Sequence, residues 1–98
     1  MEIKYLYSAI ENMAEIKRFL DEKDTRLAVK IIGDIKNRIL ELESFPLRWP
    51  KYTENSKYRV LGVHNYLVFY TVDEAKNTIS IYRILHGARN ISSIIKEK

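Results

Sequence analysis

The side chains best suited to chemistry stand near the end of the chain, in the segment Arg83-Ile-Leu-His86-Gly-Ala-Arg89-Asn90. An arginine guanidinium offers a bidentate fork for a phosphate or a carboxylate, and a histidine can transfer protons near neutral pH. Arg59, further back in the chain, completes the set of candidate site residues. Together these residue types could bind a phosphate, or stabilise the charge that develops on one as it reacts.

Arg83 raises a question of pairing, because it alternates along its predicted strand with apolar residues. A charged side chain on an apolar strand face is costly unless a partner meets it. Asp34 or Glu41, on a predicted helix, could supply that partner in a structural salt bridge. Ligand binding is the alternative role, and the residues that share the alternation are Ile79, Ile81 and Leu85.

The other candidates also have purely structural explanations. Arg59 stands at the start of a strand and could be an exposed charge without a role. His86 alternates with Tyr82 and Ile84 and could be a packing residue on the face opposite Arg83. Arg89 is the best exposed cation, and its alternative is a solvated charge near the start of a helix, where the helix dipole does not favour it.

Hydrophobic periodicity predicts an α+β chain with the element order β-α-α-β-β-β. The helices should form an αα-hairpin packed on one face of an antiparallel sheet, and the other face should be half open. A short C-terminal helix follows Asn90. The whole of residues 1–98 is predicted to be one domain. The predicted elements are strands at Ile3–Tyr7, Tyr58–Val63, Tyr66–Val72 and Thr78–Leu85, and helices at Ser8–Glu22, Thr25–Glu43 and Ile91–Glu97.

Both long helices carry a start signal and an apolar face. Ser8 with Glu11 three residues later follows the capping-box pattern, and Asp24 or Thr25 can cap the second helix. The first face contains Ile10, Met13, Ala14, Lys17 and Leu20, widened by Ile16 and Phe19. The second face contains Ala28, Ile31, Ile32, Ile35, Ile39 and Leu42.

Two connections are informative. The turn His64-Asn65 joins the first two meander strands, and asparagine tolerates a left-handed backbone there. Residues 45–57 lack regular structure, which is long for a compact domain and is typical of functional loops. The structural alternative is that Phe45, Leu47 and Trp49 plug the bottom of the core.

Composition excludes several classes of protein. No cysteine is present, no apolar run approaches the length of about 18 residues that spans a bilayer, and no signal peptide is recognisable, so a cytoplasmic protein is expected. Two histidines without cysteine argue against a zinc site, and no cofactor-binding motif occurs, so neither metal nor cofactor is expected. Residues 1–44 hold eight Lys and Arg against nine Asp and Glu, whereas residues 45–98 hold nine against four. The basic strand half therefore favours an anionic partner.

The element order, the size and the ending together resemble the RelE/ParE superfamily of type II toxins. The resemblance covers nearly the whole chain and implies a cognate antitoxin that holds the toxin inactive. It is carried by Leu42-Glu-Ser-Phe-Pro46, Tyr58-Arg59, Tyr66-Leu-Val-Phe-Tyr70 and Arg83-Ile-Leu-His86-Gly-Ala-Arg89.

The resemblance implies one of two activities. RelE-like members cleave mRNA on the ribosome without a metal, whereas ParE-like members inhibit DNA gyrase and cleave nothing. Where RelE-like enzymes typically carry basic residues on the first two meander strands, this chain has Leu61 and Leu67, and no tyrosine follows Arg89. The ending is also more similar to ParE-like members.

The sequence therefore favours a toxin that inhibits DNA gyrase by protein contact. The first alternative is a ribosome-dependent endoribonuclease with Arg59, Arg83, His86 and Arg89 as its catalytic residues. The second alternative is a non-toxic module that still binds an antitoxin. Whether the chain is an enzyme stays open at this point.

Overall fold

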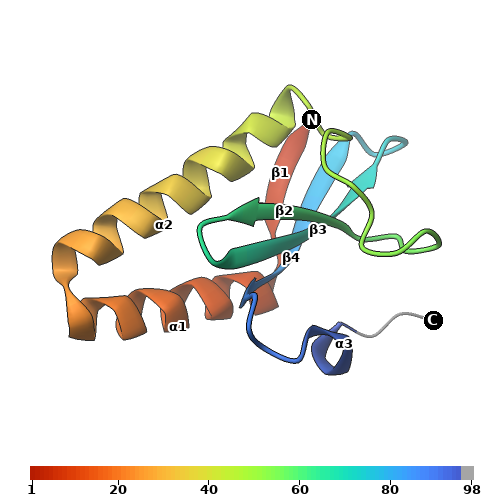
Figure 1. The fold of residues 1–98 in the computed structure, drawn as a ribbon. Coiled ribbons are helices and arrows are strands. Elements are labelled where there is room, and N and C mark those ends of the chain that lie inside the picture. Colours follow the sequence, from red (N-terminus) through yellow and green to blue (C-terminus); the bar gives the residue numbers. More distant parts are fainter. Residues whose placement is uncertain (96–98) are drawn as a thin grey trace.

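The computed structural model describes residues 1–95, and its elements follow the predicted order (Figure 1). The helix predicted over Ile91–Glu97 is observed up to Ile94, and residues 96 and 97 of that prediction lie outside the described residues. In chain order the elements are β1 (Glu2–Tyr5), α1 (Tyr7–Lys23), α2 (Thr25–Leu40), the 3-10 helix η1 (Glu41–Glu43), β2 (Arg59–Val63), β3 (Tyr66–Asp73), β4 (Thr78–His86) and α3 (Ile91–Ile94).

The strands form one sheet in the order β1-β4-β3-β2. β2, β3 and β4 form the antiparallel meander that the sequence predicts. β1 instead runs parallel to β4, with Glu2 opposite Thr78 and Tyr5 opposite Ile81. The sheet is therefore mixed and not purely antiparallel. The helical hairpin connects β1, at one edge of the sheet, to β2, at the opposite edge. The meander then returns across the sheet, so its third strand, β4, lies beside β1 and runs in the same direction.

The main core lies between the helical hairpin and one face of the sheet. In α1 the buried residues are Ala9, Asn12 and Leu20, whereas Ile10 is 53% exposed, so the predicted face is correct only in part. The helix is rotated because two of its polar side chains bond to β4, as described below. α2 buries much of its predicted stripe, namely Ala28, Ile35 and Ile39.

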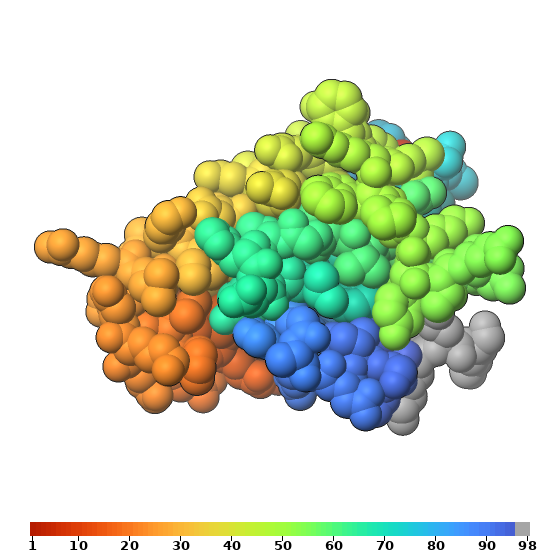
Figure 2. Space-filling model, viewed as in Figure 1, coloured from red at the N-terminus to blue at the C-terminus, as the bar shows by residue number. Residues whose placement is uncertain are grey.

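A smaller apolar cluster covers part of the second face of the sheet. Phe69 and Leu85 are buried there, Tyr52 packs edge-on against Phe69 with ring centroids 5.4 Å apart, and Ile95 closes the cluster at the C-terminal segment. In the space-filling view the loop before β2 and the C-terminal segment flank the meander strands (Figure 2). The second face is therefore covered in part by this cluster.

A β-bulge in β4 decides which way the candidate side chains point. The pairing with β3 shifts at Tyr82, which is the extra residue. Ile81 before the bulge and Ile84 after it both enter the main core, so the alternation of the strand is interrupted. Arg83 is thereby turned to the second face, together with Leu85. The prediction that Arg83 shares a face with Ile81 is wrong for this reason.

The starts of the two long helices differ in how well they were predicted. Asp24 caps α2, because its Oδ1 accepts a hydrogen bond of 2.9 Å from the backbone N of Arg26, as predicted. α1 begins at Tyr7, with Leu6 at the N-cap and no side-chain cap, so the predicted capping box at Ser8 does not form.

None of the helices in residues 1–95 has the length and apolarity needed to cross a bilayer.

The long segment before β2 is only partly a core plug. Trp49 packs against the main core, whereas Phe45 is 58% exposed and Leu47 is 50% exposed. Lys51 forms an isolated antiparallel bridge with Arg59, so the segment also covers part of the free edge of β2.

Candidate functional site

α1 closes the edge of β4 at the point where β1 stops. β1 ends at Tyr5, so within residues 1–95 the rest of β4 has no strand neighbour on that side. Ser8 Oγ donates a 2.6 Å hydrogen bond to the carbonyl oxygen of Tyr82. Asn12 Oδ1 accepts a 3.1 Å hydrogen bond from the backbone N of Ile84. The spacings agree, because four helix residues rise about 6 Å and two strand residues about 6.6 Å.

Asn12 is a residue that sequence reasoning missed. It is 6% exposed and stands in α1 next to apolar residues such as Met13. A polar residue inside an apolar helical stripe was the signal that could have identified it. Its Oδ1 accepts the hydrogen bond from the backbone N of Ile84 in β4, but its Nδ2 has no hydrogen-bond partner among residues 1–95. The side chain lines a cavity, so the cavity wall includes an unused amide donor.

The strand-end cavity, as we call it, lies between α1 and the ends of β3 and β4, and has a volume of about 300 Å³. Apolar and aromatic side chains make most of its walls, and charged groups stand beside them. Burial raises the pKa of the Tyr66 phenol, so this hydroxyl stays protonated at neutral pH. The lining residues are Asn12, Glu15, Ile16, Phe19, Tyr66, Ile84, His86 and Arg89.

His86 is an exposed member of the strand-end cavity. Its ring stands edge-on to Tyr66, with centroids 5.5 Å apart, and its Nδ1 accepts a 3.1 Å hydrogen bond from the backbone N of Ala88. A neutral imidazole whose Nδ1 accepts must carry its hydrogen on Nε2. His86 therefore offers a donor at Nε2. His86 lies on the face of the sheet opposite Arg83, as the alternation predicts. Because of the bulge, however, it is His86 that lies on the side of the helices and Arg83 that lies on the second face.

Arg89 lines the same cavity from the turn after β4. Its backbone N donates a 3.0 Å hydrogen bond to the carbonyl oxygen of His86, which fixes the turn. The Arg89 side chain is exposed, and within residues 1–95 its guanidinium forms neither a hydrogen bond nor an ion pair. Of the candidates, His86 and Arg89 are the two that the structure brings together.

Arg83 belongs to a stack of aromatic and cationic side chains on the second face. Its guanidinium lies 5.5 Å from the centroid of Tyr82, which is stacked on Tyr58 with ring centroids 4.8 Å apart. Lys57 lies 5.3 Å from the centroid of Tyr58. The Arg83 Nε is buried and unpaired among the described residues. The predicted salt bridge to a helix carboxylate does not form, because the bulge turns Arg83 away from the helices.

Arg59 is neither a free charge nor part of the cavity. Its Nη1 donates a 2.6 Å hydrogen bond to the carbonyl oxygen of Trp49 and a 3.4 Å bond to that of Leu47. Tyr70 donates a 2.9 Å bond to the carbonyl oxygen of Pro46. These contacts hold the loop before β2 against the sheet, so Arg59 has a structural role, and the alternative of an exposed charge without a role does not hold.

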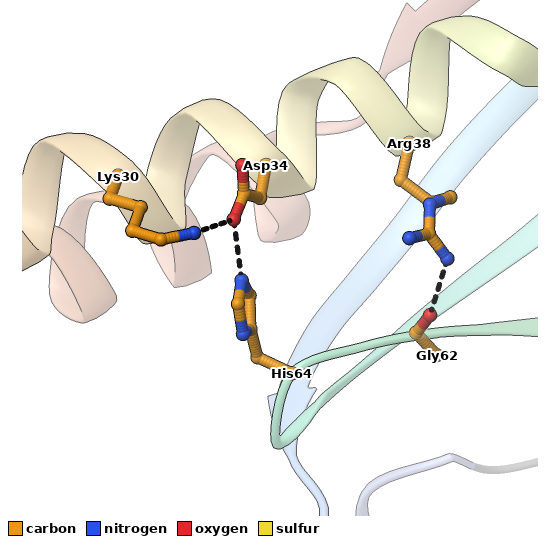
Figure 3. A network of polar contacts seen from close by, with 5 residues as sticks. All are labelled: Lys30, Asp34, Arg38, Gly62 and His64. Carbon is orange, nitrogen blue, oxygen red and sulfur yellow. Dashed lines mark hydrogen bonds and ion pairs between the residues drawn. The ribbon is translucent and has the colours of Figure 1, made fainter.

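A polar network braces α2 against the meander (Figure 3). Asp34 Oδ2 lies 2.6 Å from His64 Nε2 and 3.0 Å from Lys30 Nζ. Arg38 donates a long 3.5 Å bond to the carbonyl oxygen of Gly62. The hydrogen bonds from His64 and Lys30 lower the pKa of the Asp34 carboxyl.

The turn beside this network differs from the prediction. His64 takes the left-handed backbone, with φ of 53°, in place of Asn65. The carbonyl oxygen of Asn65 instead accepts a 2.8 Å hydrogen bond from the backbone N of Gly87. The β2–β3 turn is thereby tied to the turn after β4, next to the strand-end cavity.

The sequence profile described as the ParE toxin of the type II toxin–antitoxin system parDE matches residues 3–91. The chain belongs to the ParE toxin family. It is thus the toxin component of a type II toxin–antitoxin system within the RelE/ParE superfamily. No significant match was found among curated proteins.

Solved structures share the fold of this ParE-family chain at low sequence identity. The chromosomal ParDE toxin–antitoxin system from P. aeruginosa has a TM-score of 0.73 and 19% identity, covering 88% of this chain and 95% of that one. A RelBE2 toxin–antitoxin complex from Mycobacterium tuberculosis has a TM-score of 0.62 and 17% identity, covering 87% and 95%. The intact RelBE complex from E. coli has a TM-score of 0.63 and 11% identity, covering 90% and 98%.

In this ParE-family chain the candidate side chains occupy three separate settings. His86 and Arg89 share the strand-end cavity, Arg83 lies on the opposite face of the sheet, and Arg59 holds the loop before β2. Within residues 1–95 no three His, Cys, Asp or Glu side chains are grouped so that they could hold a metal ion.

Proposed function

We propose that the chain is a cytoplasmic toxin that inhibits DNA gyrase by direct protein contact, through the strand-end residues His86 and Arg89. A cognate antitoxin keeps it inactive until it is released. The match to the ParE toxin profile over residues 3–91 supports this proposal.

The observation that carries the proposal is the separation of the candidate cations. Metal-free RNA cleavage needs a base, an acid and charge-stabilising cations around one phosphate. Here the guanidinium of Arg59 is engaged by the carbonyl oxygens of Trp49 and Leu47, and Arg83 and His86 face opposite sides of the sheet. This arrangement supports a contact surface over a nuclease centre.

The test is the supercoiling of relaxed plasmid DNA by purified gyrase, followed on agarose gels as toxin is added. We expect loss of supercoiling that is restored when antitoxin is added in equal amount. Ordinary supercoiling at high toxin excess would contradict the proposal.

The second candidate function is ribosome-dependent mRNA cleavage, the alternative for which Arg59, Arg83, His86 and Arg89 were predicted as catalytic residues. The stack of Arg83, Tyr82 and Tyr58 favours it, because aromatic faces beside cations suit the stacking of bases. Primer extension on mRNA from a purified translation system separates the two functions. Discrete cuts that require ribosomes would replace the gyrase proposal.

The antitoxin is proposed to cover the helical hairpin on the side next to β1. An apolar cavity of about 380 Å³ lies there between α1, α2 and β1, and Ile10 at its wall is 53% exposed. Lys17 and Lys36 line the same cavity, so an apolar segment with acidic flanks would complement it. If overexpression of the free chain is harmless while antitoxin binding is intact, the chain is instead a non-toxic antitoxin-binding module.

A further inference from the structure

We propose that the strand-end cavity is the contact site for the inhibited protein, and that it takes up one large apolar side chain of that protein next to a carboxylate. The inference rests on the proposed function and adds to it the chemistry of the contact. It is carried by the combination of apolar walls, unused donors and limited size in one cavity.

The walls favour an apolar side chain, and the volume accommodates one. A space of about 300 Å³ is at the small end of ligand cavities, and it can hold one aromatic or branched aliphatic group. Ile84 and Tyr66 are buried at 1% and 6% exposure, whereas Phe19 is 54% exposed. An apolar group entering the cavity would cover the exposed ring, and such enclosed anchors dominate binding at protein interfaces.

The polar groups select a carboxylate next to that side chain. Asn12 is 6% exposed, and within residues 1–95 neither its Nδ2 nor the Arg89 guanidinium has a partner. His86 adds a donor at Nε2. Donors without acceptors favour an anionic oxygen ligand, and an arginine fork binds a carboxylate through two parallel hydrogen bonds.

A protein partner fits better than a nucleic acid. Glu15 lines the cavity beside the donors, so a phosphate chain passing along it would meet a like charge. A protein side chain brings a single carboxylate in place of a chain of phosphates, so it meets the Glu15 charge only once, and the Arg89 guanidinium can pair with it.

The experiment measures two properties of each variant, namely the toxin concentration that halves gyrase supercoiling and the affinity for the cognate antitoxin. Phe19→Ala removes the exposed ring, and Arg89→Glu reverses the charge. The matched controls are Val29→Ala and Arg26→Glu, because both residues are exposed on α2 outside this cavity. Circular dichroism verifies that each variant is folded.

We expect Phe19→Ala and Arg89→Glu each to raise the half-inhibiting concentration about tenfold or more, with antitoxin affinity within about twofold of the wild type. The control variants should match the wild type in both assays. Unchanged inhibition by both cavity variants would overturn the proposal. An equal loss of antitoxin affinity would also overturn it, because the cavity would then belong to the antitoxin.

A probe peptide separates failure of the cavity from failure of the proposed function. Acetyl-Gly-Phe-Asp-Gly-amide is titrated into the isotope-labelled chain, with the Asn peptide as the matched control. We expect the amide signals of Ile84, His86 and Arg89 to shift with the Asp peptide and much less with the Asn peptide. If the wild type does not inhibit gyrase but these signals shift, the gyrase target is wrong and the chemistry of the cavity stands. If they do not shift, the cavity assignment is wrong.

Discussion

Two regions lie side by side at the same end of the β-meander and hold their polar groups in opposite ways. On the α2 side, the Asp34 carboxylate meets both His64 and Lys30. On the α1 side, Arg89 and one end of the Asn12 amide have no partner within residues 1–95. The first region joins a helix to a turn, and its groups are satisfied within the chain. The second region leaves donors facing a cavity, which is the arrangement expected of a binding site.

This contrast predicts two kinds of outcome. Substitution of a side chain whose polar groups are hydrogen-bonded within the chain should lower stability, whereas substitution of a side chain with free donors should weaken function.

Asn12→Leu should have the largest effect on stability, because it leaves the buried N–H of Ile84 without an acceptor. The expected loss is about 1–3 kcal/mol in the free energy of unfolding, measured by urea denaturation. Asn37→Leu, on the exposed side of α2, is the control. An unchanged midpoint would show that the edge of β4 does not depend on α1.

Arg59→Ala should have the next largest effect. Its guanidinium bonds to the carbonyl oxygens of Trp49 and Leu47, so its loss should cost about 1 kcal/mol. The loop before β2 should also be cleaved faster in limited proteolysis. Arg48→Ala is the control, since Arg48 is exposed in the same loop. If Arg59→Ala and Arg48→Ala are cleaved equally fast, Arg59 does not hold the loop against the sheet.

Asp34→Asn should change the pH dependence of stability by a smaller amount. The pKa of Asp34 is lowered in the folded chain, so its carboxylate stabilises the fold above the unfolded pKa, which is about 4. That contribution is lost as the pH falls through the lower folded pKa. The wild type should therefore lose its advantage over Asp34→Asn below about pH 4, measured by urea midpoints between pH 2.5 and 7. Glu22→Gln is the control, and parallel profiles for all three chains would contradict the expectation.

Arg89→Ala should have the smallest effect on stability, within about 0.5 kcal/mol of the wild type, because its guanidinium has no partner to lose within residues 1–95. The same variant should still weaken inhibition of gyrase. A clear loss of stability would show that Arg89 has a structural role like that of Asp34, and the contrast between the two regions would not hold. Urea denaturation at neutral pH decides between these outcomes.

Much of the element pattern was predictable, because local signals agree with the fold. The stripe of α2 repeats at three and four residues, and Asp24 caps the helix as expected. The antiparallel pairing of β2, β3 and β4 was also predicted. The candidate site was predicted less well. His86 and Arg89 were correctly placed at the end of a strand, but the residues of α1 that complete the cavity were missed.

The sequence by itself determined the order of the elements, the amphipathic helical hairpin, the meander and the basic ending, because these depend on periodicity and on turn residues near in the chain. The tertiary structure alone decided the faces of Arg83 and His86, since the bulge at Tyr82 reflects pairing with β3. It also decided that β1 pairs with β4 and that Ser8 and Asn12 serve the edge of β4 instead of a helix cap. These contacts join residues about seventy positions apart, and hydrogen bonds over such separations leave no periodic pattern in the sequence.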